Sequence, residues 1–161
     1  MTLGQLNGMP EYDAVVELLK CCGSTAWAHT MAGVRRFDNF NSLCIRSERI
    51  WWQLEPADWL EAFRAHARIG ERKVPDGWSA QEQSGMNTAS ASTAEALARA
   101  SEQYLARFGY IFIVCATGKS AEEMLSILEG RMRNDPADEL SIAATEQSKI
   151  TRLRLEKLIS S

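Results

Sequence analysis

Apolar residues recur at helical spacing in one segment after another of this chain, and most of these segments end at a glycine or a proline. The first such stripe follows Pro10, stops before Gly23 and consists of Val15, Leu18, Leu19 and Cys22. Because positions i, i+3, i+4 and i+7 lie on one face of an α-helix, the stripe predicts a helix with one buried side. A chain in which this pattern keeps returning is constrained to an all-α fold.

Capping residues and the same periodicity predict the other helices. Ser24 is a suitable N-cap, and Ser120 with Glu123 forms a capping-box pattern. Pro56 suits a first helical turn, and Gly109 suits a helix end. The expected helices cover about residues 24–33, 41–55, 56–66, 91–108, 120–134 and 138–158, the last capped by Asp138, with a short helix over 79–85 after a loop at 70–77.

One segment breaks the helical pattern. YIFIVCA, residues 110–116, is a continuous apolar run rich in β-branched and aromatic residues, and it is too short for a helix of its own. It lies between Gly109 and Gly118, so it predicts a buried extended stretch. We therefore expect one compact domain over residues 1–161, a helical bundle of about seven to eight helices crossed by one buried extended segment.

Composition limits the partners of such a domain. The 161 residues are 45% apolar and carry a formal net charge of -3, with arginines scattered among acids, which gives no electrostatic footprint for nucleic acid. No apolar run approaches the roughly 20 residues needed to cross a bilayer, and the N-terminus lacks the pattern of a signal peptide. We expect a cytoplasmic protein without a nucleic-acid or membrane partner.

The cysteines and histidines do not suggest a metal site. The four cysteines include the vicinal pair Cys21–Cys22 and no C-x-x-C, so we expect them to be reduced and mostly buried. His29 and His66 stand far apart, and neither has cysteine or carboxylate neighbours at metal-ligand spacing. No structural or catalytic metal is expected.

His66 is the first candidate for a catalytic residue. It falls at i+7 from Trp59 on the apolar face of the expected helix 56–66, just before a glycine-containing loop. A helix C-terminus favours a protonated imidazole, so the position suits a general acid. A histidine on an apolar face is also often a satisfied core residue, and spacing alone does not decide between the two.

Ser79, Glu82 and Gln83 form a second candidate group. S-x-x-E is the pattern of a capping box, which is a purely structural device. A glutamine beside a carboxylate also offers the donors and acceptors that grip an amide-like or urea-like edge.

Two further features, residues 117–120 and Arg154, each have a structural and a functional interpretation. TGKS, residues 117–120, looks like part of a phosphate loop, but that pattern needs glycine where Ile113 stands, so nucleotide hydrolysis is disfavoured. The backbone N–H groups of the preceding segment would still serve as oxyanion donors if they are not used in pairing. Arg154 lies on the predicted last helix, where a solvated cation is the default and a carboxylate clamp is the alternative.

Four blocks of the sequence, in this order and at this spacing, resemble the 2-oxo-4-hydroxy-4-carboxy-5-ureidoimidazoline (OHCU) decarboxylases of urate catabolism, in a bacterial version. The blocks are DWLEAFRAHARIGE, WSAQEQSGM, RFGYIFIVCATGKS and KITRLRL, and they cover nearly the whole chain. The family pattern has His-Pro where this chain has His66-Ala67.

The resemblance implies a set of roles for these residues. His66 would be the catalytic proton donor, Glu82 would hold or relay its proton, and Gln83 would orient the ureido group. The implied substrate-binding residues are Ala67, Ser79, Gln83, Phe112, Ile113, Val114, Cys115, Ala116 and Arg154. The implied reaction is the decarboxylation of OHCU to (S)-allantoin, the last step from urate to allantoin, without a metal or organic cofactor.

Other functions stay open at this point. The same pocket would also suit a helical ureide-binding or interaction protein without turnover, or an unrelated small-acid lyase or hydrolase using His66 and Glu82. The five tryptophans exceed what a core of this size requires, which together with the resemblance favours a homodimer.

Overall fold

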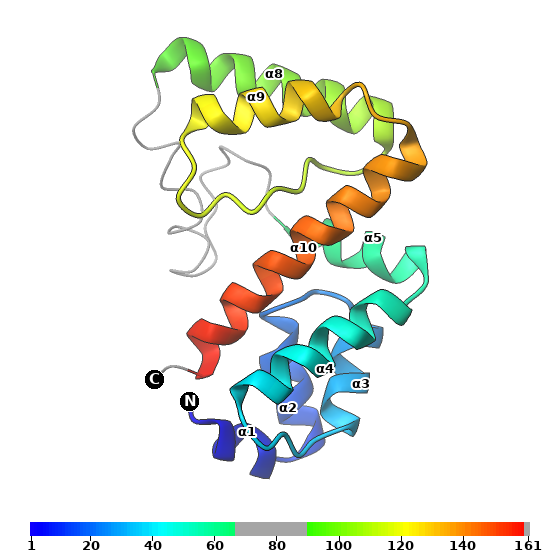
Figure 1. Ribbon diagram of the computed structural model, residues 1–161, viewed down its shortest axis with the longest axis vertical. Helices are drawn as coiled ribbons and strands as arrows, with labels where there is room; N and C mark the ends of the chain where they lie inside the picture. The colour runs from blue at the N-terminus through cyan, green and yellow to red at the C-terminus, as the bar shows by residue number, and fades with distance from the viewer. Residues whose placement is uncertain (67–89, 160–161) are drawn as a thin grey trace. The chain divides into compact units, whose positions relative to one another are not determined.

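The computed structural model describes residues 1–66 and 90–159, and in these ranges the chain forms eight helices and no strand (Figure 1). The predicted all-α class is therefore confirmed. None of the described helices is both long and apolar enough to span a bilayer. The short helix expected over residues 79–85 and the loop over 70–77 lie outside the described residues.

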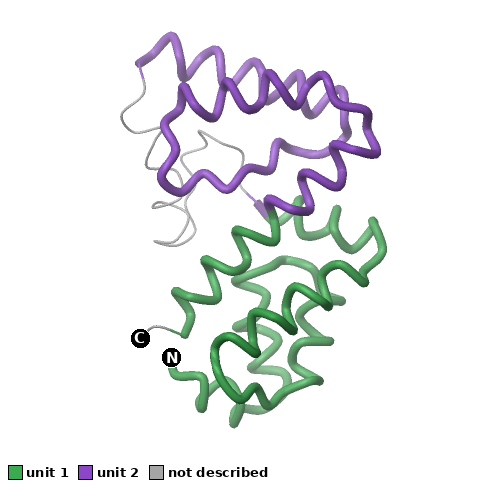
Figure 2. The backbone as a smooth tube through the Cα atoms, in the orientation of Figure 1, with its two compact units in different colours: residues 1–65, 147–161 green, residues 66–146 purple. Residues whose placement is uncertain are grey.

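The chain divides into two compact units (Figure 2). Unit 1 comprises residues 1–65 and 147–161, and unit 2 comprises residues 66–146. Two compact units can belong to one domain, so a single domain over residues 1–161 stays a prediction.

Unit 1 is built from short helices around an apolar core. It contains α1 (Leu3–Gly8), α2 (Glu11–Leu19), α3 (Thr25–Gly33), α4 (Phe40–Gln53), α5 (Pro56–Arg64) and the later part of α10 (Pro136–Ile159). As predicted, Ser24 caps α3, its Oγ accepting from the Trp27 N–H at 3.2 Å. The fully buried side chains, each contributing roughly 1.5–3 kcal/mol, include Leu6, Leu18, Trp27, Met31, Phe63 and Leu155.

Several boundaries in unit 1 differ from the sequence-based expectation. Helix α1 was not expected, and α2 ends at Leu19 rather than near Gly23. Helix α5 ends at Arg64, and Ala65 donates its N–H to the Ala62 carbonyl in a final tight turn. His66 therefore lies beyond α5 instead of on its apolar face.

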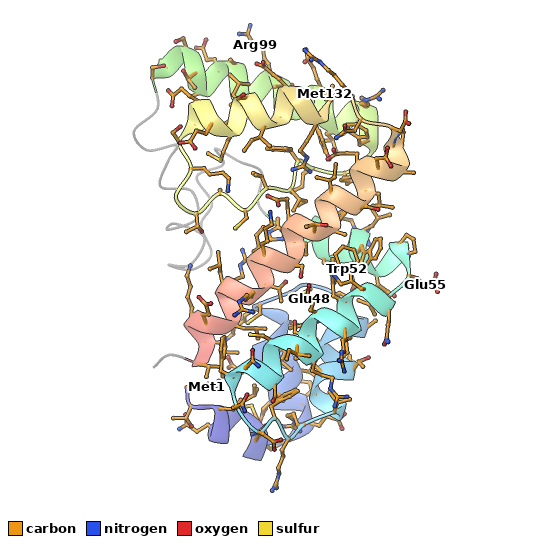
Figure 3. The ribbon with its side chains drawn as sticks, in the orientation of Figure 1. Met1, Glu48, Trp52, Glu55, Arg99 and Met132 are labelled. Carbon is orange, nitrogen blue, oxygen red and sulfur yellow. The ribbon has the colours of Figure 1, made fainter. Side chains whose placement is uncertain are left out.

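The tryptophans of unit 1 are partly stacked on one another. Trp52 lies on α4 (Figure 3). It is 40% exposed and meets Trp59 edge to face, with ring centroids 5.6 Å apart. The Trp59 indole N–H donates to the Trp51 carbonyl at 2.9 Å. Three of the chain's five tryptophans thus make ring contacts with one another inside unit 1, so the number of tryptophans alone does not require a second chain.

Unit 2 packs two antiparallel helices over the extended segment. Helix α8 (Ala91–Phe108) ends at Gly109, whose φ of +83° is the left-handed conformation that glycine adopts without strain. Helix α9 (Ala121–Arg131) begins with the predicted reciprocal capping box of Ser120 and Glu123. Helix α10 begins at Pro136, so Asp138 lies in its first turn and is not the cap that the sequence suggested.

The extended segment between these helices is confirmed. Residues 111–116 have no regular structure, and Phe112–Cys115 are buried. Phe112 and Val114 join the core cluster of unit 2 with Leu97, Tyr104, Ala121, Met124 and Leu128. The apolar run is thus held in place by the side chains of α8 and α9.

Candidate functional site

The predicted site residues fall into three groups in the structure. Ala67, Ser79, Glu82 and Gln83 lie outside the described residues. His66 and residues 112–116 belong to unit 2, and Arg154 belongs to unit 1. The structure therefore gives the local setting of His66, of the extended segment and of Arg154.

His66 follows a helix end that is fixed by close packing. It is half-buried and lies two residues after the end of α5. Ala65, next to it, approaches Gly23 so closely that a Cβ atom on Gly23 would lie 2.4 Å from the Cβ of Ala65. The residue just before His66 thus packs against the turn between α2 and α3.

The extended segment is held by side chains rather than by a β-ladder. The Ile113 carbonyl accepts from Arg131 Nη1 at 2.6 Å, and the Cys115 carbonyl accepts from Lys119 Nζ at 2.7 Å. The Cys115 N–H donates to Glu146 Oε1 at 3.1 Å. Since buried backbone polar groups need partners, these three side chains stabilise an irregular backbone inside the unit.

Several N–H groups of the segment make no hydrogen bond to the described part of the backbone. Within the part of the chain that the structure describes, the N–H groups of Ile113, Val114 and Ala116 donate to no backbone carbonyl. This is what the predicted role as oxyanion donors requires. The Cys115 N–H differs because it is already donated to Glu146.

A buried polar cluster that sequence reasoning missed lies beside the segment. Arg131 donates from Nε and Nη2 to Glu139 Oε2, at 2.8 and 2.6 Å. The Tyr104 hydroxyl also donates to Glu139 Oε2, and Asn134 Nδ2 donates to Glu139 Oε1 at 3.1 Å. Burial raises the pKa of Tyr104, and its hydrogen bond to Glu139 adds to the effect, so this hydroxyl stays a donor.

Arg154 lies near the vicinal cysteines. Burial raises the pKa of Cys21 to about 12, and the Arg154 charge is the largest effect in the opposite direction. The pKa of Cys22 is likewise raised to about 12 by burial, against hydrogen bonds from Ser24 and Thr151. All four cysteines are buried, in agreement with the prediction.

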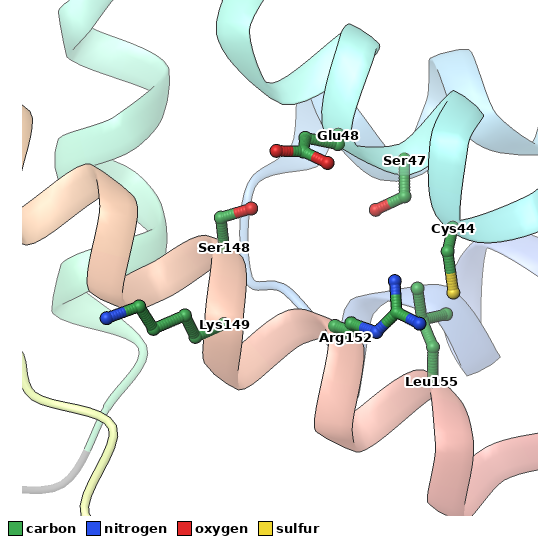
Figure 4. Close-up of a pocket in the computed structure, with 7 residues that line it drawn as sticks. All are labelled: Cys44, Ser47, Glu48, Ser148, Lys149, Arg152 and Leu155. Atoms are coloured by element: carbon green, nitrogen blue, oxygen red, sulfur yellow. The ribbon is translucent and has the colours of Figure 1, made fainter.

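A cavity of unit 1 is lined by none of the predicted site residues that the structure describes. It has a volume of about 140 Å³ and is lined by Cys44, Ser47 and Glu48 of α4 and by Ser148, Lys149, Arg152 and Leu155 of α10 (Figure 4).

The described residues form an all-α fold, with His66 just after the end of α5 and a buried apolar segment in unit 2. The sequence profile of the OHCU decarboxylase family matches residues 7–156. This chain belongs to the OHCU decarboxylase family.

Comparisons with known proteins agree with this assignment. The chain is 41% identical over 148 residues to the uric acid degradation bifunctional protein TTL of Arabidopsis thaliana, covering 87% of this chain and 45% of that protein. It is 26% identical to the OHCU decarboxylase of Haloferax volcanii, covering 100% of this chain and 98% of that protein. A crystal structure of OHCU decarboxylase in the presence of (S)-allantoin matches with a TM-score of 0.81 at 41% identity, covering 90% of this chain and 98% of that chain.

Proposed function

We propose that this chain decarboxylates OHCU to (S)-allantoin, the last step from urate to allantoin, without a cofactor. The observation that carries the proposal is the likeness to an OHCU decarboxylase crystallised in the presence of (S)-allantoin, which extends over 98% of that chain. The chain spans less than half of the Arabidopsis relative, so the proposal concerns the decarboxylase activity and not the whole of that bifunctional protein.

The chemistry needs little from the protein beyond orientation and one proton. The departing carboxylate of OHCU lies beside an imine carbon, so the electron pair left by carbon dioxide has an acceptor inside the substrate. The protein must hold the carboxylate out of the plane of that acceptor and stabilise the developing negative charge with fixed donors. It must then protonate one face of the ring.

We assign the proton to His66. It follows the C-terminal end of α5, where the helix dipole favours a cationic imidazole, and the packing of Ala65 on Gly23 fixes the chain that carries it. A proton delivered from one face gives a single enantiomer. Glu82 would hold or relay this proton.

The remaining roles are those that the family resemblance implies. The N–H groups of Ile113, Val114 and Ala116 would face the developing negative charge, and Arg154 would bind a carboxylate through its planar fork. Ser79 and Gln83 would grip the ureido group, and Ala67 would contact the substrate where the family has proline.

We further propose that the protein works as a cytoplasmic homodimer. Ile45 and Trp52 on α4 are 45% and 40% exposed, which leaves apolar surface that a second copy would cover. Sedimentation equilibrium measures the mass in solution, and a monomer across micromolar concentrations would contradict the dimer.

Circular dichroism of the allantoin formed tests the proposed activity. The unstable substrate is generated in place from urate, and its spontaneous decay gives racemic product without a signal. We expect the protein to speed the decay and to produce the signal of (S)-allantoin. If it binds allantoin but leaves the decay unchanged, it is a ureide-binding protein and the proposal is wrong.

A further inference from the structure

The peptide between Ile113 and Val114 has its orientation set by one arginine. The Ile113 carbonyl points to Arg131 Nη1 at 2.6 Å, and the peptide bond is trans. In a trans peptide the carbonyl and the N–H of the next residue point in opposite directions. Arg131 therefore directs the Val114 N–H away from itself, and no described backbone carbonyl accepts that N–H.

Arg131 can set the orientation of this peptide because hydrogen bonds hold its own guanidinium group in one position. One edge of the guanidinium, Nε and Nη2, is bound to Glu139 Oε2, which leaves Nη1 for the Ile113 carbonyl. The group also lies 4.6 Å from the centre of the Phe112 ring, so it contacts two consecutive residues of the segment. A lysine ammonium has no planar fork and could not reproduce this set of contacts.

Glu139 is in turn held from two other elements. Tyr104 of α8 donates to its Oε2, and Asn134, between α9 and α10, donates to its Oε1. Glu139 is completely buried and Arg131 is 7% exposed. Rotation of either side chain would leave a buried charge without its partners, so the pair has one stable arrangement.

We propose that Arg131, held by Glu139, is a positioning residue that aims the Val114 N–H at the substrate. The inference rests on the proposed decarboxylation and extends it to residues that need not touch the substrate. In this account the cluster of Arg131, Glu139 and Tyr104 converts an irregular backbone segment into a fixed hydrogen-bond donor.

Arg131→Lys is the principal test, and Arg107→Lys is its matched control. Arg107 also donates to a backbone carbonyl in unit 2, that of Asn134 at 2.8 Å, but it does not contact the segment. We expect Arg131→Lys to raise hydrogen exchange in residues 111–116 at least about tenfold. It should lower kcat at least about tenfold with a smaller change in KM, because a donor aimed at developing charge acts in the transition state. Arg107→Lys should match wild type within about twofold in the hydrogen exchange of residues 111–116 and in kcat.

Protection by (S)-allantoin separates this inference from the proposed function. We expect added (S)-allantoin to slow exchange at the Val114 amide in wild type and Arg107→Lys, and much less in Arg131→Lys. A wild-type protein without decarboxylase activity would overturn the proposed function, while this binding result would still decide the role of Arg131. Equal protection of the Val114 amide in all three proteins would overturn the inference. So would an Arg131→Lys protein whose residues 111–116 exchange faster while its kcat is unchanged.

Tyr104→Phe covers the case in which Arg131→Lys does not fold. It removes one donor to Glu139 and keeps the aromatic ring that packs on Phe112. We expect the same direction of change in exchange and kcat, by about two- to fivefold. If Tyr104→Phe leaves both unchanged, Glu139 does not hold Arg131 in the way proposed.

Discussion

Gly23 and Ala65 are in such close contact that a methyl group on Gly23 would lie 2.4 Å from the Cβ of Ala65. The contact joins the turn after α2 to the end of α5, one residue before His66. It lies at the point where α5 ends, at Arg64, so the apolar spacing that suggested a helix through His66 does not continue.

Gly23→Ala should therefore destabilise unit 1. Overpacking of this kind costs about 1–3 kcal/mol, and because the strain falls on Ala65 we also expect a lower kcat. Urea denaturation measures the free energy of unfolding. Gly33→Ala is the control, since nothing lies within 4 Å of its Cβ position and alanine favours the helix by up to about 1 kcal/mol. Equal stability of the two variants would contradict the close contact.

Glu61→Gln should weaken the link between α5 and α3 in a pH-dependent way. Glu61 accepts from the N–H and the hydroxyl of Thr25, at 2.9 and 2.5 Å, and these hydrogen bonds lower the pKa of its carboxyl. A lowered folded-state pKa gives stability that is present above the unfolded-state pKa and is lost as the pH falls through the folded-state value.

At pH 7 we expect Glu61→Gln to lose about 0.5–1 kcal/mol, because a neutral amide accepts more weakly. The loss should shrink as the pH falls below about 4. Urea denaturation across pH measures it, with the exposed Glu48→Gln on α4 as the control. A difference from wild type that stays constant down to pH 3 would contradict the ionised hydrogen bond.

The vicinal thiols should be unreactive in the native protein. With the pKa of Cys21 and Cys22 near 12, roughly one thiol in ten thousand is ionised at pH 8, and both side chains are completely buried. A colorimetric thiol reagent should label neither within minutes and should label all four cysteines in guanidinium. Fast native labelling of Cys21 or Cys22, located by mass spectrometry, would contradict this burial.

A double-mutant cycle should reveal the coupling between Arg131 and Glu139. Glu139→Leu alone leaves a buried guanidinium without its carboxylate, so we expect a loss of about 3–5 kcal/mol. Arg131→Met with Glu139→Leu removes both charges and should recover a large part of that loss. Denaturant unfolding of the four proteins gives the coupling, and additive losses would show that the pair is not coupled.

Local signals in the sequence predicted much of the fold. Ser24, the Ser120–Glu123 pair and Gly109 lie at the helix ends they indicated, because caps depend on residues within one turn. The apolar run over residues 110–116 was likewise identified from composition alone. Helix α1 was missed because six residues are too few for an apolar stripe, although its Thr2–Gln5 capping box was visible.

Contacts between distant segments could not be predicted in this way. Arg131 and Glu139 stand eight residues apart, at the end of one helix and the start of the next, and the turn between α9 and α10 brings them together. Ala65 at the end of α5 likewise packs on Gly23, which is 42 residues away in the sequence. Pattern rules for a single element do not include such pairs.

We propose that His66 donates the proton that makes the product (S)-allantoin. The most direct measurement is the circular dichroism of allantoin formed from urate in place, with wild type, His66→Ala and His29→Ala compared at equal concentration. His29 is the other histidine of the chain and lies exposed on α3, so it is the matched control. We expect full (S)-allantoin signal from wild type and His29→Ala and a rate at least about a hundredfold lower from His66→Ala. Equal signal from His66→Ala and His29→Ala would contradict the account.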